Sequence, residues 1–329
     1  MEGKRTKNTL KPSGIAIFVA LVAVVVVVLA VSSNIVRPKD NTPDSGTIDP
    51  IANGVLGEPA DTLDVVFIGD SEAAASFSPL QMWDQQGFTS YVCFTPGQQL
   101  HYANTILHRA LENQQPKVVV FETDMLYTHF SIGDVLVRAA SDVLPVFEYH
   151  DRWKNLTPED FSTPVKATWT DPLKGYKFLQ EREPADDSGY MAPTDEAETV
   201  PLLNRLFMKM MVDYCRERGS DVVFVSVPST VNWSTAKHNG ARAFADELGV
   251  DYVDMNTGDS FVKIDWAMET HDAGDHLNKD GAVKTSSYFG EYLSDAYGLP
   301  DHRDDAAYEN WNDALASYFE TTGIDPGTM

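Results

Sequence analysis

The sequence predicts an α/β fold: a three-layer α/β/α sandwich around a parallel sheet, with a transmembrane helix near the N-terminus. Three observations predict it. Short β-branched runs alternate with longer amphipathic segments, as the strands and crossover helices of a parallel sheet do. The runs are apolar throughout, which is typical of strands buried on both faces. An uncharged stretch of 18 residues stands near the beginning of the chain.

Five strands and five main helices are expected in the order that this alternation gives. The predicted strands are Asp64–Ile68, Ser90–Phe94, Lys117–Glu122, Asp221–Val227 and Asp251–Asp254, and the predicted helices are Pro79–Gln86, Gln98–Asn113, Pro201–Arg218, Thr235–Leu248 and Gly281–Tyr297. Right-handed crossovers then give a doubly wound, flavodoxin-like sheet. In such sheets ligands bind beyond the carboxyl ends of the strands, so the residues that follow each strand are the candidates for a site.

The apolar stretch from Gly14 to Val31 is long enough to cross a hydrocarbon core of about 30 Å at about 1.5 Å per residue. Four basic residues precede it, and the positive-inside rule therefore places the N-terminus in the cytoplasm and the body outside, in a single-pass cell-membrane protein. A cleaved signal peptide is the competing interpretation, with Ala30-Val31-Ser32 as the cleavage site. Its apolar region is usually shorter, at 7–15 residues, which favours the uncleaved anchor.

The charge of the body excludes nucleic acid as a partner. The whole chain has a formal net charge of −24, and residues 38–329 alone carry 20 basic and 48 acidic residues. Phosphate backbones would repel such a surface.

The expected organisation has a basic cytoplasmic segment over 1–13, the anchor over 14–34 and a Pro- and Gly-containing linker over 35–60. The main domain follows over 61–300. Residues 127–200 interrupt its alternation and are interpreted as an inserted cap over the site edge, and 301–329 form an acidic C-terminal extension. Cys93 and Cys215 have no metal-ligand spacing and are expected to be buried free thiols.

Gly69-Asp70-Ser71 leaves the first strand, where a serine hydroxyl would be exposed beside backbone N–H groups that favour a developing oxyanion. A plain turn is the alternative, because these residue types are common in turns. Far along the chain, His276 lies on a predicted loop, and two acids, Asp272 and Asp275, come shortly before it. A serine hydroxyl needs a base and an acid that orients the base, and both segments fall at the same edge of the predicted sheet.

These two motifs resemble those of the SGNH (GDSL-type) serine hydrolase family. Gly69-Asp70-Ser71 matches its first block, and Asp272 to Asn278 with Gly281-Ala282 its C-terminal block. The resemblance implies the SGNH hydrolase fold over roughly 60–300. It implies Ser71 as nucleophile and His276 as general base. It also implies an oxyanion hole from the backbone N–H groups of Ser71 and Gly97, within Thr95-Pro96-Gly97-Gln98.

The sequence departs from the family pattern at two places. The family's acid lies three residues before the histidine, where this chain has Ala273, so Asp272 or Asp275 must orient the imidazole. Asp272 is favoured, because neighbouring side chains point apart in extended structure. The family's third block, with its Asn, is missing, and Thr123 after the third strand is the expected substitute donor. Asn232 and Trp233, after the fourth strand, are candidate sugar contacts, with edge packing as the alternative.

The anchor and the two motifs are most similar to membrane-anchored extracytoplasmic members, such as those of alginate O-acetylation and teichoic-acid D-alanylation. The resemblance implies a serine esterase or O-acyltransferase that acts on an acylated cell-envelope or secreted glycan and works beside a membrane-bound O-acyltransferase. It requires no metal and no organic cofactor. The alternative is a non-catalytic glycan-binding or assembly subunit that retains the fold.

Overall fold

The computed structural model describes residues 12–324 and divides the chain into two units. One unit, here called the anchor unit, consists of residues 12–39 and 135–165. The other, the sheet unit, consists of residues 40–134 and 166–324.

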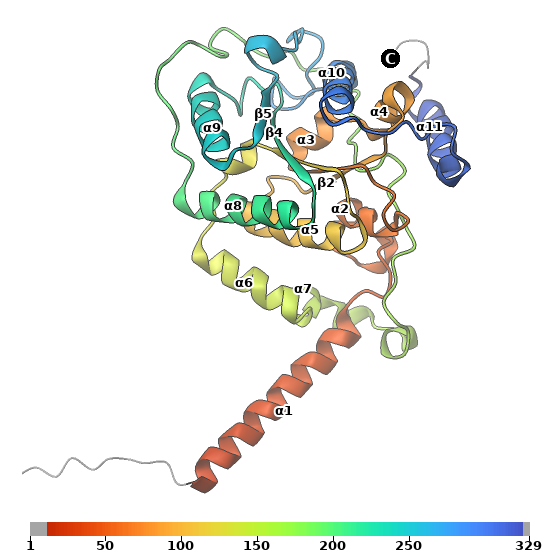
Figure 1. Cartoon of the computed structure of the whole chain (residues 1–329). Helices are drawn as coiled ribbons and strands as arrows, with labels where there is room; N and C mark the ends of the chain where they lie inside the picture. The colour runs from red at the N-terminus through yellow and green to blue at the C-terminus, as the bar shows by residue number, and fades with distance from the viewer. Residues whose placement is uncertain (1–11, 325–329) are drawn as a thin grey trace, which may run out of the picture. The chain divides into compact units, whose positions relative to one another are not determined.

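The sheet unit is built on five parallel strands, which confirms the predicted fold class (Figure 1). They are β1 Val65–Gly69, β2 Ser90–Phe94, β3 Val118–Glu122, β4 Asp221–Ser226 and β5 Asp251–Asp254. Their spatial order is β2-β1-β3-β4-β5, the flavodoxin-like doubly wound order. Val65 is in register with Ser90 on one side and Val118 on the other, so the strand ends of β1, β2 and β3 are level at the carboxyl edge.

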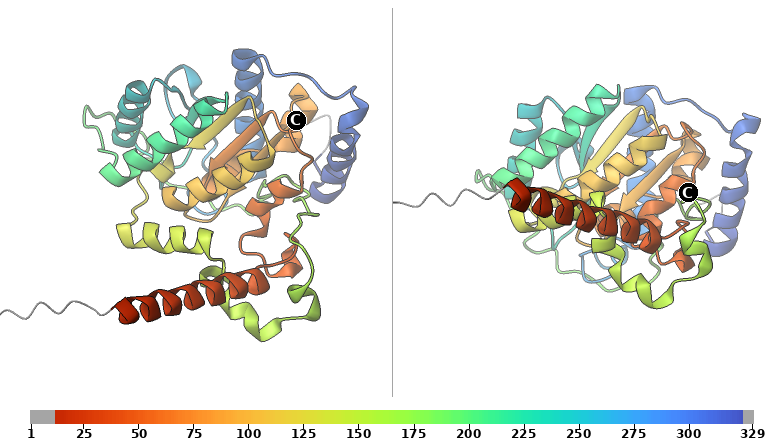
Figure 2. Two further views of the ribbon diagram at one scale, coloured as in Figure 1. Left: turned by 60° about the horizontal axis from the view of Figure 1, so that its bottom comes forward. Right: turned by 90° about the horizontal axis from the view of Figure 1, so that it is seen from below.

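Helices cover both faces of this sheet (Figures 1 and 2). Two long helices cover one face: α5 Leu100–Asn113 and α8 Leu202–Glu217. The opposite face carries α3 Ser71–Ser76, α4 Pro79–Gln86 and α10 Lys279–Tyr297. The helix α9 Thr235–Leu248 packs beside β5. Three phenylalanine rings pack together in the core between the sheet and the second helix layer, with ring centroids 4.9–6.1 Å apart. They are Phe67 of β1, Phe77 and Phe289 of α10.

Both cysteines are buried, on β2 and α8, and both are free, as expected. Burial raises the pKa of Cys215 to about 12 and the pKa of Cys93 further still. Neither thiol is therefore ionised near neutral pH, and neither is expected to react with aqueous thiol reagents.

Much of the stretch expected to be a linker, 35–60, has secondary structure of its own. Residues 43–57 form two 3-10 turns and the short helix α2 Pro50–Asn53, packed on the sheet unit. The Tyr91 hydroxyl donates to the Ile51 carbonyl at 2.7 Å, and the Asn41 amide donates to the Trp169 carbonyl at 2.6 Å. The segment is held by partners far away in the sequence, which local composition does not reveal.

The stretch interpreted as one cap, 127–200, is divided between the two units. Residues 166–200 belong to the sheet unit, where Lys177 donates a backbone hydrogen bond to Ala74 of α3 and Glu183 accepts one from Ala273. Residues 135–165 belong to the anchor unit. The acidic extension forms α11 Glu309–Thr322, which packs on α4 through the buried Trp311.

The anchor unit contains the apolar helix α1 Pro12–Val36. Within it, Gly14–Val36 is long and apolar enough to span a membrane by length and composition, with a mean hydropathy of 3.3. The rest of the unit comprises most of α6 Ile132–Val143, then α7 Val146–Tyr149 and the 3-10 helices His150–Asn155 and Pro158–Phe161. The last three contact α1 near its C-terminal end.

Candidate active site

Ser71 is the first residue of α3, directly beyond the carboxyl end of β1. Asp70 caps this helix, because its Oδ1 accepts a hydrogen bond from the Glu72 backbone N–H at 2.9 Å. Gly69 permits the tight turn: a Cβ at that position would lie 2.4 Å from the Cβ of Ala73. The Gly-Asp-Ser motif thus gives a strand-to-helix turn with a half-buried serine at its tip.

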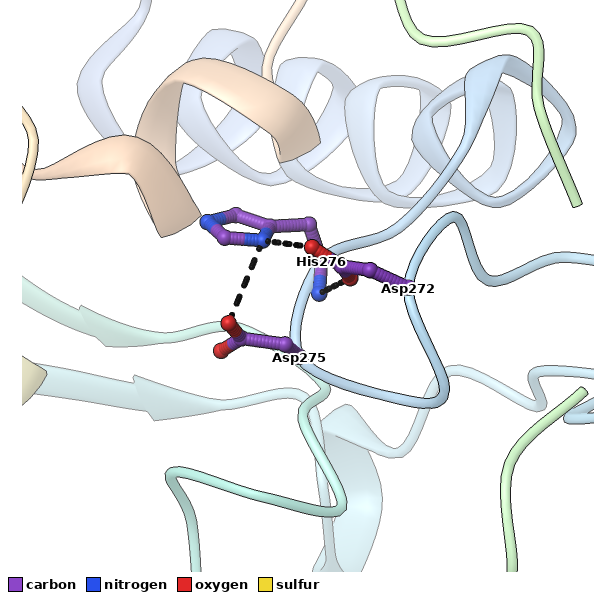
Figure 3. A group of neighbouring side chains, drawn as sticks. All are labelled: Asp272, Asp275 and His276. Atoms are coloured by element: carbon purple, nitrogen blue, oxygen red, sulfur yellow. Dashed lines mark hydrogen bonds and ion pairs between the residues drawn. The ribbon is translucent and has the colours of Figure 1, made fainter. Parts of the chain in front are cut away.

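His276 lies on the loop before α10, between two carboxylates (Figure 3). Its Nδ1 is 2.7 Å from Asp272 Oδ2 and 3.6 Å from Asp275 Oδ2. The backbone N–H of His276 donates to the other oxygen of Asp272, also at 2.7 Å. Partial burial by itself raises the pKa of Asp272, but these hydrogen bonds outweigh it and leave the pKa below its ordinary value. Asp272 is therefore ionised, and it accepts the hydrogen bond from Nδ1 of the imidazole. The other ring nitrogen, Nε2, is left for another partner.

The loop that carries His276 is closed on itself. Thr270 and Leu277 form an antiparallel bridge, and the Thr270 hydroxyl accepts from the Gly274 N–H at 2.7 Å. Ala273 and Gly274 both have left-handed backbone angles, with φ of 56° and 95°. A Cβ on Gly274 would lie 1.9 Å from the Thr230 hydroxyl oxygen. Glycine is therefore required at this bend, and the loop has little freedom to move the histidine.

One amide joins the serine turn to the histidine loop. Asn232 Nδ2 donates to Glu72 Oε1 at 2.5 Å and to Asp275 Oδ1 at 2.5 Å. Glu72 follows Ser71 in the chain and Asp275 precedes His276. Ser229, on the same loop after β4, donates to the Gly274 and Asp275 carbonyls at 3.0 Å. The neighbours of the predicted nucleophile and of the predicted base are thus bonded to one side chain.

Buried carboxyl groups surround the serine turn. Burial raises the pKa of Asp70 to about 7, with the charges of Asp124 and Asp275 adding to the effect. Burial also raises the pKa values of Glu72 and Glu122 well above their ordinary range. Lys237 forms an ion pair with Asp124 at 2.8 Å. A raised pKa favours the neutral form of each carboxyl group, and this lessens the repulsion that an oxyanion beside them would feel.

The other sequence-predicted residues are placed as follows. Gly97 has φ of 57° and no atom within 4 Å of where a Cβ would stand. Gln98 is buried and accepts from the Thr95 hydroxyl at 3.2 Å. Thr123, the expected substitute donor, is fully buried, and its hydroxyl is 2.5 Å from that of Ser226. Its hydroxyl is thus engaged within the interior and not presented to solvent.

Trp233 is buried, which does not fit the expected sugar contact. Its indole N–H donates to Asp254 Oδ2 at 3.0 Å, and its ring packs edge-on against Tyr127. Asn232 lies at the site, but it contacts the two acids described above. The sequence analysis predicted neither this contact nor a role for Glu72. The position of Asn232 after β4, at the carboxyl edge of the sheet, was the signal that could have indicated the contact.

In the part of the chain that the structure describes, one cluster of side chains could hold a cation: Asp272, Asp275 and His276. Each offers one ligand atom, and these atoms lie within 4.8 Å of one another. However, the Nδ1–Oδ2 separation of 2.7 Å is a hydrogen-bond distance. It is shorter than the spacing of two ligands that each lie about 2.0–2.2 Å from one tetrahedral zinc ion. The arrangement fits a His–Asp hydrogen bond better than a metal centre.

Comparison with known proteins gives similar solved structures. They include a GDSL-like lipase from Bacteroides thetaiotaomicron (12% identity, 70% of this chain and 88% of that one, TM-score 0.36). Another is a lipase/acylhydrolase from Enterococcus faecalis (10% identity, 72% of this chain and 97% of that one, TM-score 0.38). A third is an acetylxylan esterase from Geobacillus stearothermophilus (10% identity, 74% of this chain and 98% of that one, TM-score 0.34). No family model matches, and no curated protein matches.

Proposed function

We propose that this protein is a membrane-tethered extracytoplasmic serine esterase or O-acyltransferase that acts on acetyl or related esters of a cell-envelope or secreted glycan. Ser71 is the nucleophile, His276 the general base and Asp272 the residue that orients the imidazole. The observation that carries the proposal is the Asn232 bridge between Glu72 and Asp275, combined with the Asp272–His276 hydrogen bond. Together they join a serine turn to an oriented imidazole at one edge of the sheet.

In the first half-reaction the Ser71 hydroxyl oxygen attacks the ester carbonyl carbon while His276 Nε2 takes the hydroxyl proton. The carbonyl π electrons move to its oxygen, and the backbone N–H groups of Ser71 and Gly97 stabilise this oxyanion. Its collapse breaks the ester C–O bond, the leaving alcohol takes the proton from Nε2, and an acyl-serine remains. Asp272 stabilises the transient imidazolium through Nδ1.

In the second half-reaction water or a sugar hydroxyl attacks the acyl-serine and gives its proton to Nε2. Collapse breaks the serine ester bond, and the proton returns to the Ser71 oxygen. Water releases a free carboxylic acid and makes the protein an esterase. A sugar hydroxyl takes the acyl group and makes it a transferase. Neither step requires a metal or an organic cofactor.

The proposed location is supported by α1 and by the charges around it. The helix segment Gly14–Val36 is long enough for a span, and four basic residues precede it. An esterase takes its acyl group from the glycan ester itself, whereas an O-acyltransferase outside the membrane needs an acyl donor delivered across that membrane. A membrane-bound O-acyltransferase is the proposed partner for that step, and an acylated polysaccharide is the proposed substrate or product.

Labelling with a fluorophosphonate probe tests the proposal on the full chain. We expect the wild type to be labelled and to hydrolyse a chromogenic acetyl ester. Ser71→Ala and His276→Ala should lose both properties and keep the wild-type melting temperature. Ser317→Ala, at an exposed serine of α11, is the matched control and should be labelled like the wild type. A folded wild type that is neither labelled nor active would contradict the proposal and favour the glycan-binding or assembly subunit.

A further inference from the structure

The helix α6 has an apolar face that no part of the described chain covers. Leu136 and Val143 are 65% and 77% exposed, and both lie on the same side of the helix as Ala140. Arg138 and Asp142 lie on the opposite side, where Arg138 forms ion pairs with Asp142 and Glu148 at 2.9 Å and 2.6 Å. A helix with this division of faces, whose apolar side is the exposed one, lacks the partner that would bury that side.

The segment that follows α6 continues this apolar surface with aromatic side chains. Phe147, Trp153 and Phe161 are each about half exposed or more. Large aromatic residues at this exposure are uncommon on a water-facing surface and are enriched where a protein meets the membrane interface.

The same segment is attached to one end of α1. The backbone N–H of Val146 donates to the Ser33 hydroxyl at 3.1 Å. The Arg152 guanidinium donates to the Val36 carbonyl, the last in α1, at 2.6 Å. Both contacts are within the anchor unit, and Figure 2 shows α7 and the turns after it beside the C-terminal turns of α1.

This attachment fixes the depth of the segment. The 23 residues of Gly14–Val36 extend over about 34 Å, slightly more than the hydrocarbon core of about 30 Å. If α1 spans the membrane, its last turn, with Ser33 and Val36, lies at the boundary between hydrocarbon and headgroups. Residues bonded to that turn lie at the same level, and Val143 is only three residues before Val146.

We infer that residues 135–165 form a second membrane contact, in which α6 lies in the bilayer interface and inserts its apolar face among the lipid acyl chains. The inference rests on the membrane anchor of the proposed function, and it is independent of the chemistry at Ser71. The occupant is lipid of no particular charge: the segment has three basic and five acidic residues, so attraction to anionic headgroups does not contribute.

Site-specific fluorescence in phosphatidylcholine vesicles tests the inference on the full chain. Single cysteines for a small fluorophore are placed at Leu136→Cys and Val143→Cys on the apolar face, and at Asp142→Cys on the polar face of the same helix. Val25→Cys reports on α1. Since Cys93 and Cys215 are buried with raised pKa values, the unsubstituted chain provides the background.

With lipid brominated near the headgroup end of its acyl chains, the two apolar-face labels should lose about half of their emission. Aqueous iodide should quench them little. The label at Asp142 should show the reverse, and the result should be the same without anionic lipid. If the Val25 label is quenched by brominated lipid but the α6 labels respond to iodide alone, the inference is wrong and the anchor stands.

Two further results would overturn the inference in other ways. Protection of the α6 labels from both quenchers would mean that a second copy of the chain covers this face. Val25 is at the midpoint of Gly14–Val36, so its label is tested with lipid brominated near the methyl end of the acyl chains. Failure of that lipid to quench it would remove the anchor itself, whatever the fluorophosphonate experiment gives.

Discussion

Both oxygens of Asp272 bind the same residue: Oδ1 accepts the backbone N–H of His276 and Oδ2 accepts its Nδ1, each at 2.7 Å. Two bonds from one carboxylate fix the imidazole in rotation as well as in position. They also fix the tautomer, because the proton on Nδ1 leaves Nε2 unprotonated and able to accept the serine proton. Asp275, at 3.6 Å, contributes charge but no such constraint.

This arrangement predicts unequal effects for the two acids. Asp272→Asn should lower kcat for an acetyl ester by about 10⁴, since an amide that donates to Nδ1 selects the wrong tautomer. Asp275→Asn should remain within about tenfold of wild type, a change of about 1.4 kcal/mol in the activation free energy. Steady-state kinetics of both variants checks this. Equal losses in the two would contradict the role given to Asp272.

Removal of the Asn232 bridge should destabilise the site edge. Asn232→Ala leaves the buried Glu72 without its amide donor, and we expect the free energy of unfolding to fall by about 1–3 kcal/mol in urea titrations. It should lower kcat as well, because the serine turn and the histidine loop lose their common partner.

The matched control for this prediction is Asn239→Ala. The Asn239 amide also makes two hydrogen bonds, to the Thr194 and Glu196 carbonyls, but both bonds are exposed to solvent. Its loss should change the free energy of unfolding by less than about 0.5 kcal/mol and leave kcat unaltered. Similar losses at both positions would show that the bridge has no special role.

Stability should depend on pH through Asp70. The folded-state pKa is about 7 against an ordinary value of 3.8, so the folded protein keeps a proton that the unfolded chain releases. This contribution is fully present below 3.8 and is lost as the pH rises through about 7. Asp70→Asn keeps the helix cap and removes the titration.

We therefore expect Asp70→Asn to match wild type in acid and to exceed it in free energy of unfolding at pH values above about 7. Urea titrations across this range measure the difference. Parallel curves for the two proteins would mean that Asp70 has no raised pKa in the folded state.

A buried ion pair joins the end of the predicted linker, at Glu58, to Lys174, which also contacts the C-terminal helix α11. Lys174 Nζ lies 2.7 Å from Glu58 Oε1, with both side chains almost fully buried, and 4.8 Å from the centre of the Trp311 ring. Lys174→Met should cost about 3–5 kcal/mol of the free energy of unfolding, because it leaves Glu58 charged and unpaired. Adding Glu58→Gln should recover part of this loss.

The control for that prediction is the exposed pair of Lys209 and Asp213, which has the same 2.7 Å separation. Lys209→Met should change the free energy of unfolding by at most about 1 kcal/mol, since water screens and solvates the remaining charge. Chemical denaturation of the wild type and these three variants gives the comparison. A loss at Lys209 as large as at Lys174 would contradict the importance of burial.

The sheet was predictable because its signals are local. The run that contains Val65–Gly69 is apolar and β-branched, and no tertiary contact is needed to recognise it. The linker was not predictable, since Asn41 is held by Trp169, which is 128 residues away. The role of Asn232 depends on two partners that are 160 and 43 residues away. Composition and spacing place such residues at an edge but do not pair them.

The bent loop from Thr270 to Leu277 holds its imidazole through bonds inside itself and to the loop after β4, none of which involves the Ser71 hydroxyl. Replacing that hydroxyl by hydrogen should consequently leave the binding geometry whole. The resulting inactive protein could therefore be used to capture an intact ester from cell-envelope extracts and to crystallise the complex.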